Sequence, residues 1–226
     1  MVELVARQVC FRHPQVLPAL PSSGPFRLRD GQAEAPAELL QVFACGEESV
    51  ALAFARLGSP PLEGAACRGL ARIADEELTH ERLLRGLRFA LPTPARDREL
   101  RRAMIHFYHG IAQGDVGRNL ASITALDSAL CMILSALLEP KRVLAHDPTV
   151  AAIFRRIHRD EVGHVRFSRC IAVELAGRNA ISAVAERTRI GLVDVLRRRG
   201  AALERLGIDA EMLFARLGRV PRGLFP

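Results

Sequence analysis

The sequence has few aromatic rings other than phenylalanine and almost no lysine. It contains no tryptophan, one tyrosine (Tyr108) and one lysine (Lys141), so 31 of its 32 basic residues are arginines, and its net charge is +7. Because the arginines are scattered along the chain, we expect most of them to lie on solvated helix faces. A basic surface for RNA stays an open alternative, although the chain offers few rings on which bases would stack.

The cysteine pattern and the hydropathy exclude further classes of protein. The five cysteines are an odd number without C-x-x-C spacing, which argues against a disulfide framework, a zinc ribbon and a rubredoxin module. No apolar run approaches the roughly 20 residues of a membrane-spanning helix. Charges interrupt the first residues, so we expect no signal peptide and no membrane partner. The expected location is the cytoplasm, and 226 residues suffice for one domain with a substantial core.

Proline and glycine divide the chain into segments. Residues 1–35 are rich in both and are expected to form an irregular N-terminal arm. From Pro36 onward, alanine- and leucine-rich stretches with helical periodicity alternate with turn signals. They predict helices at 36–57, 62–90, 118–139, 148–176 and about 180–204, with a polar crossover at 95–117. We therefore predict an all-α fold, with a four-helix bundle over 36–176 and an additional helix and tail over 177–226.

Two segments carry the pattern acid-Glu-x-x-His. They are residues 76–80 (EELTH) and 160–164 (DEVGH), and each lies deep inside a predicted helix. Residues three apart share one side of a helix, so each segment presents a carboxylate and an imidazole to one point. One such motif arises often by chance, whereas two copies in matching positions indicate a site built by both halves of the chain.

The helical repeat places both motifs on apolar helix faces. It runs through Leu70, Ile73, Glu77, His80, Leu84 and Leu87 on one helix and through Val150, Ile153, Ile157, Glu161 and His164 on another. Glu47 and Asp127 occupy equivalent positions on the first and third predicted helices. Unpaired charge on such a face is costly, and no arginine or lysine occupies these faces to compensate it.

Metal ions would compensate this charge. The six inward candidates are Glu47, Glu77, His80, Asp127, Glu161 and His164. Their four carboxylates carry about −4, which two divalent cations neutralise, and a mixed carboxylate and imidazole set suits iron or manganese. Inward Glu and Glu-x-x-His groups in a four-helix bundle are the arrangement of di-iron carboxylate proteins. The alternative is a degenerate site whose acids and histidines only form ion pairs with one another.

Two neighbouring residues stay open as extra ligands. A shift of one residue in helix phase would exchange Glu47 for Glu48, which we otherwise expect to be solvated or to lie behind the ligands. His158 lies one turn before Glu161, and we expect it on the helix surface or at the rim of the site.

With these motifs the chain resembles the ferritin-like di-iron superfamily, which includes bacterioferritin, rubrerythrin, soluble methane monooxygenase and the ribonucleotide reductase small subunit. The resemblance covers about residues 36–176, and Asp127 departs from it because most members carry glutamate there. It implies two iron ions, or a manganese–iron pair, as cofactor. It also implies that Glu76 and Asp160 accept hydrogen bonds from the non-ligating nitrogens of the opposite histidines.

The resemblance favours an O2-activating oxygenase or oxidase that acts on a small organic metabolite and takes electrons from an external donor, as a monomer or homodimer. Small residues near the expected ligands, such as Gly46, would leave room for a substrate or would equally permit close helix packing. His106, Tyr108 and His109 lie in the crossover, and no pattern in the sequence supports a role for them at a substrate entrance. Three alternatives stay open: a tRNA hydroxylase-like di-iron monooxygenase, a ferritin-like ferroxidase that stores iron, and a non-catalytic helical protein with a vestigial metal site.

Overall fold

The computed structural model describes residue 28 and residues 33–57, 62–92, 97–111 and 114–225. Nearly all of the expected arm at 1–35 lies outside this part of the chain. Every regular element within the described residues is a helix. The all-α prediction is therefore confirmed.

The four long helices expected from the sequence are all present. The elements are α2 (Glu34–Leu57), α3 (Gly64–Phe89), α4 (Arg98–Ile111), α5 (Val116–Leu137), the 3-10 turn η1 (Val143–His146), α6 (Pro148–Ala176), α7 (Arg178–Arg197), α8 (Gly200–Arg205) and α9 (Ala210–Leu217). The ends of α2, α3, α5 and α6 lie within two residues of the predicted ends.

Local capping explains where α6 begins and ends. The buried Asp147 carboxylate accepts hydrogen bonds from the backbone N–H groups of Thr149 and Val150, both at 3.0 Å. Pro148 occupies the first turn, where its missing N–H leaves no bond unmade. Gly177, with a φ of 73°, ends the helix in a backbone conformation that other residues rarely adopt. These two signals fix the position of α6 along the chain.

Two sequence predictions about the C-terminal half and the crossover need correction. The single fifth helix predicted at about 180–204 is divided into α7 and α8, and the expected tail contains a further helix, α9. The crossover at 95–117 also contains a helix, α4. It forms because Leu100, Met104 and Tyr108, spaced four apart, make one apolar face that packs into the protein.

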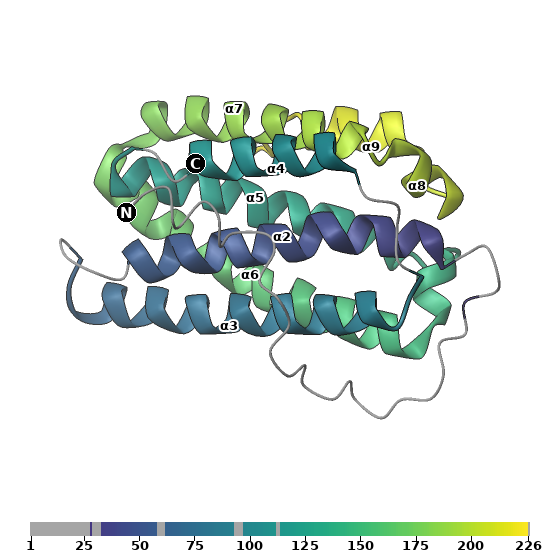
Figure 1. Cartoon of the computed structure of the whole chain (residues 1–226). Helices are drawn as coiled ribbons and strands as arrows, with labels where there is room; N and C mark the ends of the chain where they lie inside the picture. The colour runs from purple at the N-terminus through teal and green to yellow at the C-terminus, as the bar shows by residue number, and fades with distance from the viewer. Residues whose placement is uncertain (1–27, 29–32, 58–61, 93–96, 112–113, 226) are drawn as a thin grey trace.

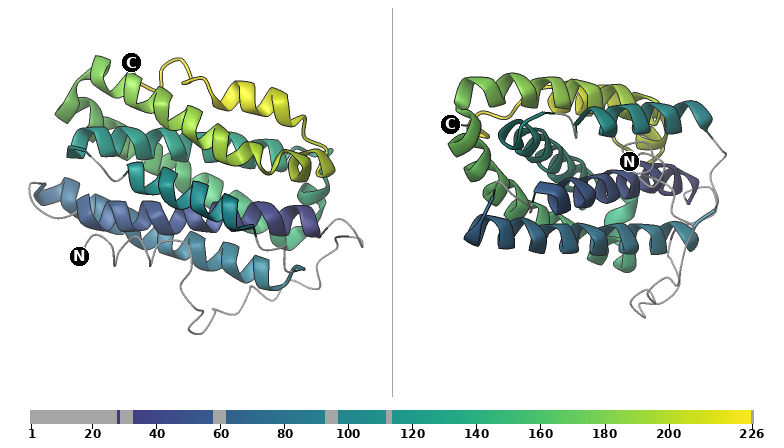
Figure 2. Two further views of the ribbon diagram at one scale, coloured as in Figure 1. Left: turned by 45° about the horizontal axis from the view of Figure 1, so that its top comes forward. Right: turned by 60° about the vertical axis from the view of Figure 1, so that its left-hand side comes forward.

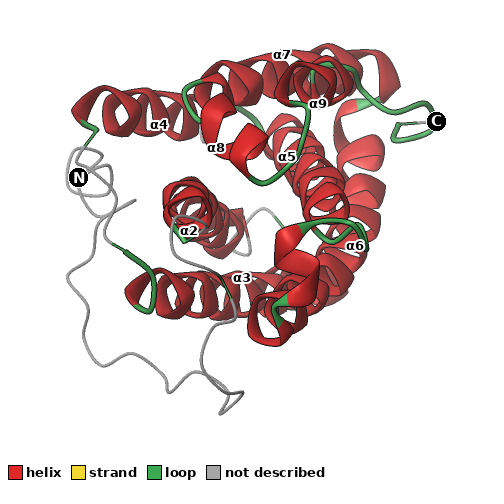
Figure 3. Ribbon diagram, turned by 90° about the vertical axis from the view of Figure 1, so that its right-hand side faces the viewer, coloured by secondary structure: helices red, strands yellow, loops and turns green. Residues whose placement is uncertain are grey.

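The helices are arranged in three layers. Figure 1 shows α3 and α6 in one outer layer, α2 and α5 in the middle, and α4 and α7 in the other outer layer. The tilted and turned views of Figure 2 and the view along the helices in Figure 3 show the same order. The main contacts join α2 to α3, α5 to α6, and α5 to α7. The middle layer is therefore covered on two sides.

The apolar character of α5 follows from this position. Contrary to the sequence expectation, Val116–Leu137 is long and apolar enough to meet the criteria for a membrane-spanning helix. However, 67% of its most apolar window is buried inside the protein, as in the core helix of a helical domain.

The cysteines also depart in part from expectation. Cys67, Cys131 and Cys170 form no disulfide bond. Cys45 on α2 is disulfide-bonded, which the odd cysteine count did not lead us to expect. One bridge is not the framework of a disulfide-rich fold, and the helical core remains the main source of stability.

Candidate metal centre

Four helices bring the six predicted ligands together in the interior. Glu47 comes from α2, Glu77 and His80 from α3, Asp127 from α5, and Glu161 and His164 from α6. Each of the six is at most 4% exposed. The periodicity argument is therefore right for all of them.

The side chains form two overlapping groups of four. Glu47, Glu77, His80 and Glu161 can offer one ligand atom each within 4.8 Å of one another, and so can Glu77, Asp127, Glu161 and His164. Glu77 and Glu161 belong to both groups. Two carboxylates that belong to both groups could serve two metal ions at once. Each group would then add one histidine and one further carboxylate for its own ion.

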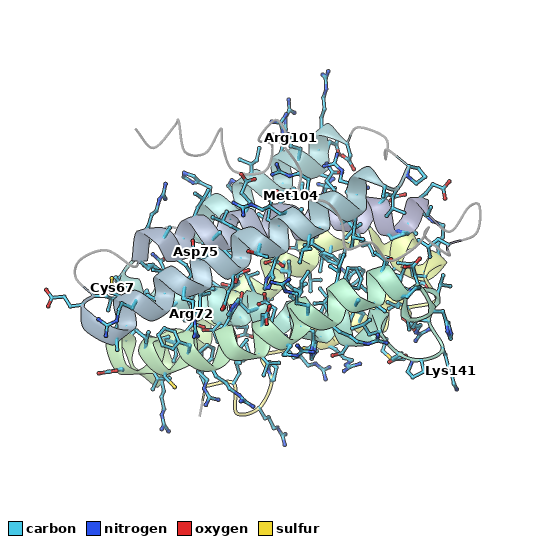
Figure 4. The ribbon with its side chains drawn as sticks, turned by 90° about the horizontal axis from the view of Figure 1, so that it is seen from below. Cys67, Arg72, Asp75, Arg101, Met104 and Lys141 are labelled. Carbon is cyan, nitrogen blue, oxygen red and sulfur yellow. The ribbon has the colours of Figure 1, made fainter. Side chains whose placement is uncertain are left out.

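The local sequence of α3 explains why its charged residues divide between inside and outside. Arg72 and Asp75, labelled in Figure 4, lie on the exposed face of this helix. Glu77 and His80 follow Ile73 on the opposite, buried face. A helix of 3.6 residues per turn makes this division with no bend or insertion.

The two histidines point the same ring nitrogen into the cluster. The Nδ1 atom of His80 lies 3.4 Å from a carboxylate oxygen of Glu47 and 3.2 Å from one of Glu161. The Nδ1 atom of His164 lies 3.0 Å from Glu77 and 3.6 Å from Glu161. A metal ligand on each imidazole is therefore available at Nδ1.

The opposite ring nitrogens contact the acids that precede the motifs. The Nε2 atom of His80 is 3.2 Å from Oδ2 of Asp160, and the Nε2 atom of His164 is 2.9 Å from Oε2 of Glu76. Each acid is thus placed on the histidine of the other motif, as the resemblance implied. An Nε2–H that donates to a carboxylate holds the ring in one orientation and leaves Nδ1 free of a proton for a metal.

Several buried polar atoms of the cluster have no hydrogen-bond partner. One oxygen of Glu47, one of Asp127, both of Glu161 and Nδ1 of His80 are buried and make no hydrogen bond. No arginine or lysine in the described part of the chain forms an ion pair with any of these four residues. Buried polar atoms normally have partners, so this set fits cations that carboxylates and imidazoles bind.

The pKa values of the metal-free cluster follow from its burial and crowding. Burial, followed by the charge of Glu77, raises the pKa of Glu47 from 4.5 to about 8. Burial and the neighbouring acids also raise the pKa of Asp127 well above 3.8. Burial alone would lower the pKa of His164, but its contacts with Glu161 and Glu77 raise it to about 12. In the metal-free protein, bound protons therefore neutralise the negative charge that metal cations would otherwise neutralise.

The structure places the two residues that the sequence left open. Glu47, and not Glu48, belongs to a group that could hold a metal ion. Glu48 is nevertheless buried, at 3% exposure, and is not solvated. His158 is half-buried outside both groups, and its Nε2 lies 3.0 Å from the Ser135 hydroxyl.

A cavity borders three of the acids, and none of the residues that line it belongs to α6. Glu47, Glu77 and Asp127 contribute to its wall, and so do Gly46 and Tyr108. The sequence left Gly46 open between making room for a substrate and close helix packing, and it supported no role for Tyr108. It gave no sign of the contribution of α7, whose Leu192 and Leu196 also line the cavity.

In the comparisons with known proteins, no family model, no curated protein and no solved structure matches this chain.

Proposed function

We propose that this protein is a ferritin-like, O2-activating oxygenase or oxidase that uses two iron ions, or one manganese and one iron, to oxidise a small organic molecule. The observation that carries the proposal is the pair of four-residue groups that share Glu77 and Glu161. The match of two histidines with four carboxylates supports iron or manganese over a metal that prefers thiolates.

The ligands divide the work of holding the metals. Glu47 and His80 would bind one ion, Asp127 and His164 the other, and the two shared glutamates would bridge them. When bound and reduced, such a pair would supply electrons for the reduction of O2, this reaction would be coupled to oxidation of an adjacent substrate, and an external donor would restore the electrons. Aspartate has a shorter arm than the glutamate usual in this superfamily, so Asp127 would make the second half of the site different from the first.

Residues around the ligands prepare the site for this chemistry. Asp160 and Glu76 accept the Nε2–H hydrogen bonds and so keep both imidazoles aimed inward. Tyr108 of α4 and Leu192 and Leu196 of α7 form part of the cavity wall beside the acids, where they would limit access of water. The predominantly apolar cavity next to the ligands favours an organic substrate over a site devoted to the storage of iron.

Metal analysis combined with O2 exposure tests the proposal. The protein is loaded anaerobically with Fe²⁺, freed of excess metal and mixed with O2 while its absorption spectrum is recorded. We expect about two irons per chain and a transient absorption band, as in other di-iron carboxylate bundles. Glu161→Gln should lose the metal, because it removes a ligand shared by both ions.

Glu174→Gln is the matched control, since Glu174 lies on the same helix but is exposed. It should retain the metal and the band. Wild-type protein that is fully helical but holds no metal would refute the proposal and indicate a vestigial site. A hollow shell of many subunits that accumulates iron beyond the two-ion load would indicate storage.

A further inference from the structure

The cavity beside the ligands is narrow and mainly apolar. It lies where α2, α4, α5 and α7 meet, and its volume is about 50 Å³. Its apolar wall includes Val42 and Val50 from α2, Leu126 and Ile133 from α5, and Leu192 and Leu196 from α7. An engineered apolar cavity of about 150 Å³ binds benzene. The space here is too small for an aromatic ring and suits a slim aliphatic group.

The polar lining of the cavity is limited to four side chains. Three are the acids Glu47, Glu77 and Asp127, which the metal site uses, and the fourth is Tyr108. Tyr108 is only 7% exposed, and its hydroxyl makes no hydrogen bond to another described residue. A tyrosine hydroxyl in the interior usually finds a partner, so this one, which borders the cavity, is available to a ligand or a water there.

Gly46 fixes the position of this hydroxyl. A Cβ atom added at Gly46 would lie 2.8 Å from the hydroxyl oxygen of Tyr108, whereas the next ring atom, Cζ, would be 3.6 Å away. The tyrosine therefore fits against α2 only because residue 46 has no side chain. Since residue 46 precedes Glu47, the hydroxyl is held at the level of the metal ligands.

The charge of the lining limits the ligand further. No arginine or lysine is among the residues that line the cavity. A carboxylate or phosphate there would meet only acids and a phenol, and would be repelled in the metal-free protein. A neutral group that can exchange one hydrogen bond with a phenol is the better match.

We propose that this cavity binds the reacting end of a slim aliphatic molecule that carries one hydroxyl, amine or carbonyl group, and that Tyr108 positions this group by a hydrogen bond. The inference rests on the proposed function in that it takes the ligand to be the substrate. Tyr108 acts here as a positioning residue, and the aliphatic part of the ligand packs against the walls from α2, α5 and α7.

Binding of small probes to the full chain, with metal removed, tests the cavity apart from the metal chemistry. Xenon, 1-propanol and benzyl alcohol are titrated while the methyl resonances of Val50, Leu192 and Leu196 are followed by NMR. We expect saturable shifts with xenon and 1-propanol and none with benzyl alcohol. Tyr108→Phe should weaken 1-propanol binding by about fivefold to tenfold and leave xenon binding unchanged, because only the alcohol uses the hydrogen bond.

Unchanged xenon binding also shows that the Tyr108→Phe protein keeps its cavity. Equal affinity of wild type and Tyr108→Phe for 1-propanol would overturn the role of Tyr108. Absence of xenon and 1-propanol binding to wild type, or equally tight binding of benzyl alcohol, would overturn the cavity assignment. Protein that binds 1-propanol but takes up no iron would refute the proposed function and leave the binding site standing.

A second set of variants tests how Gly46 places the tyrosine. Gly46→Ala should displace Tyr108 from its place against α2 and abolish binding of both 1-propanol and xenon. In the double variant Gly46→Ala/Tyr108→Phe the closest contact becomes an ordinary one, so xenon binding should return. Gly110→Ala is the matched control, because this glycine lies on α4 near Tyr108 and a Cβ there meets nothing within 4 Å. A Gly46→Ala protein that binds 1-propanol as tightly as Gly110→Ala would overturn the assignment.

Discussion

Replacing Glu47 with glutamine is expected to stabilise the metal-free protein at neutral and alkaline pH. Glu47 is fully buried among other acids, and burial together with Glu77 raises its pKa from 4.5 to about 8. The folded protein therefore holds this proton more tightly than the unfolded chain does. The resulting stability is fully present below about pH 4.5 and is lost as the pH rises through about 8.

The size of the effect follows from the pKa shift. A change from 4.5 to about 8 corresponds to about 5 kcal/mol of unfolding free energy at about 1.4 kcal/mol per pKa unit. That is a large fraction of the total stability of most domains, which is about 5–15 kcal/mol. The pKa values of His80 and His164 are also raised, so their contributions are likewise lost as the pH rises, but at higher pH. All three groups act in the same direction.

Urea unfolding of chelator-treated protein, followed by circular dichroism between about pH 5 and pH 8, measures this dependence. Glutamine imitates the protonated acid, so Glu47→Gln should match wild type near pH 5 and exceed it at pH 8. Saturating Mn²⁺ should reverse the wild-type trend, because metal binds the deprotonated carboxylates. Glu174→Gln, which changes an exposed glutamate, serves as control. The reasoning fails if metal-free wild type is equally stable at both pH values, or if Glu47→Gln declines as steeply as wild type.

Three further substitutions address the supporting structure. Asp160→Ala should lower metal affinity by about 10–100-fold in a chelator competition, because His80 loses the carboxylate that orients it; unchanged affinity would contradict that role. Asp147→Ala should reduce the free energy of unfolding by about 1–2 kcal/mol through loss of the α6 cap, and an unchanged urea midpoint would refute this. Arg189 is fully buried and donates hydrogen bonds to the carbonyls of Leu217 and Arg219 at 3.0 and 2.9 Å. Arg189→Met should therefore speed amide hydrogen exchange in α9, and protection equal to wild type would argue against this anchoring.

The inward positions of the ligands could be predicted because charge interrupts a regular apolar repeat. Glu77 and His80 fall in register with leucines and isoleucines that are themselves buried, so their direction follows from helix geometry alone. Asp127 was the least expected of the six. It is nevertheless only 4% exposed, and it belongs to the same group of possible ligands as His164. A lone acid in a long apolar helix is a strong indication of a function, even when its arm is shorter than the usual one.

The cavity could not be predicted because its wall includes residues of the third layer. A four-helix bundle buries one face of each helix, and a residue next to that face is expected at its edge. Here α4 and α7 cover a second face of the middle layer, and the buried residues of α2 include Glu48, which lies beside its apolar repeat. The contacts of α7 with α5 join residues more than 50 positions apart, as Thr188 and Ser122 do. No local pattern announces such a distant partner.

The three-layer arrangement also places the residues that would hold metal and the residues that close the cavity on different helices. The residues that would retain the metals lie on α2, α3, α5 and α6, whereas Tyr108, Leu192 and Leu196 shape the chamber from α4 and α7. Substitutions in the covering layer can alter what fits without altering any ligand. On the proposed function, the chain would suit directed evolution, in which libraries confined to α4 and α7 explore new substrates while the candidate metal ligands are kept constant.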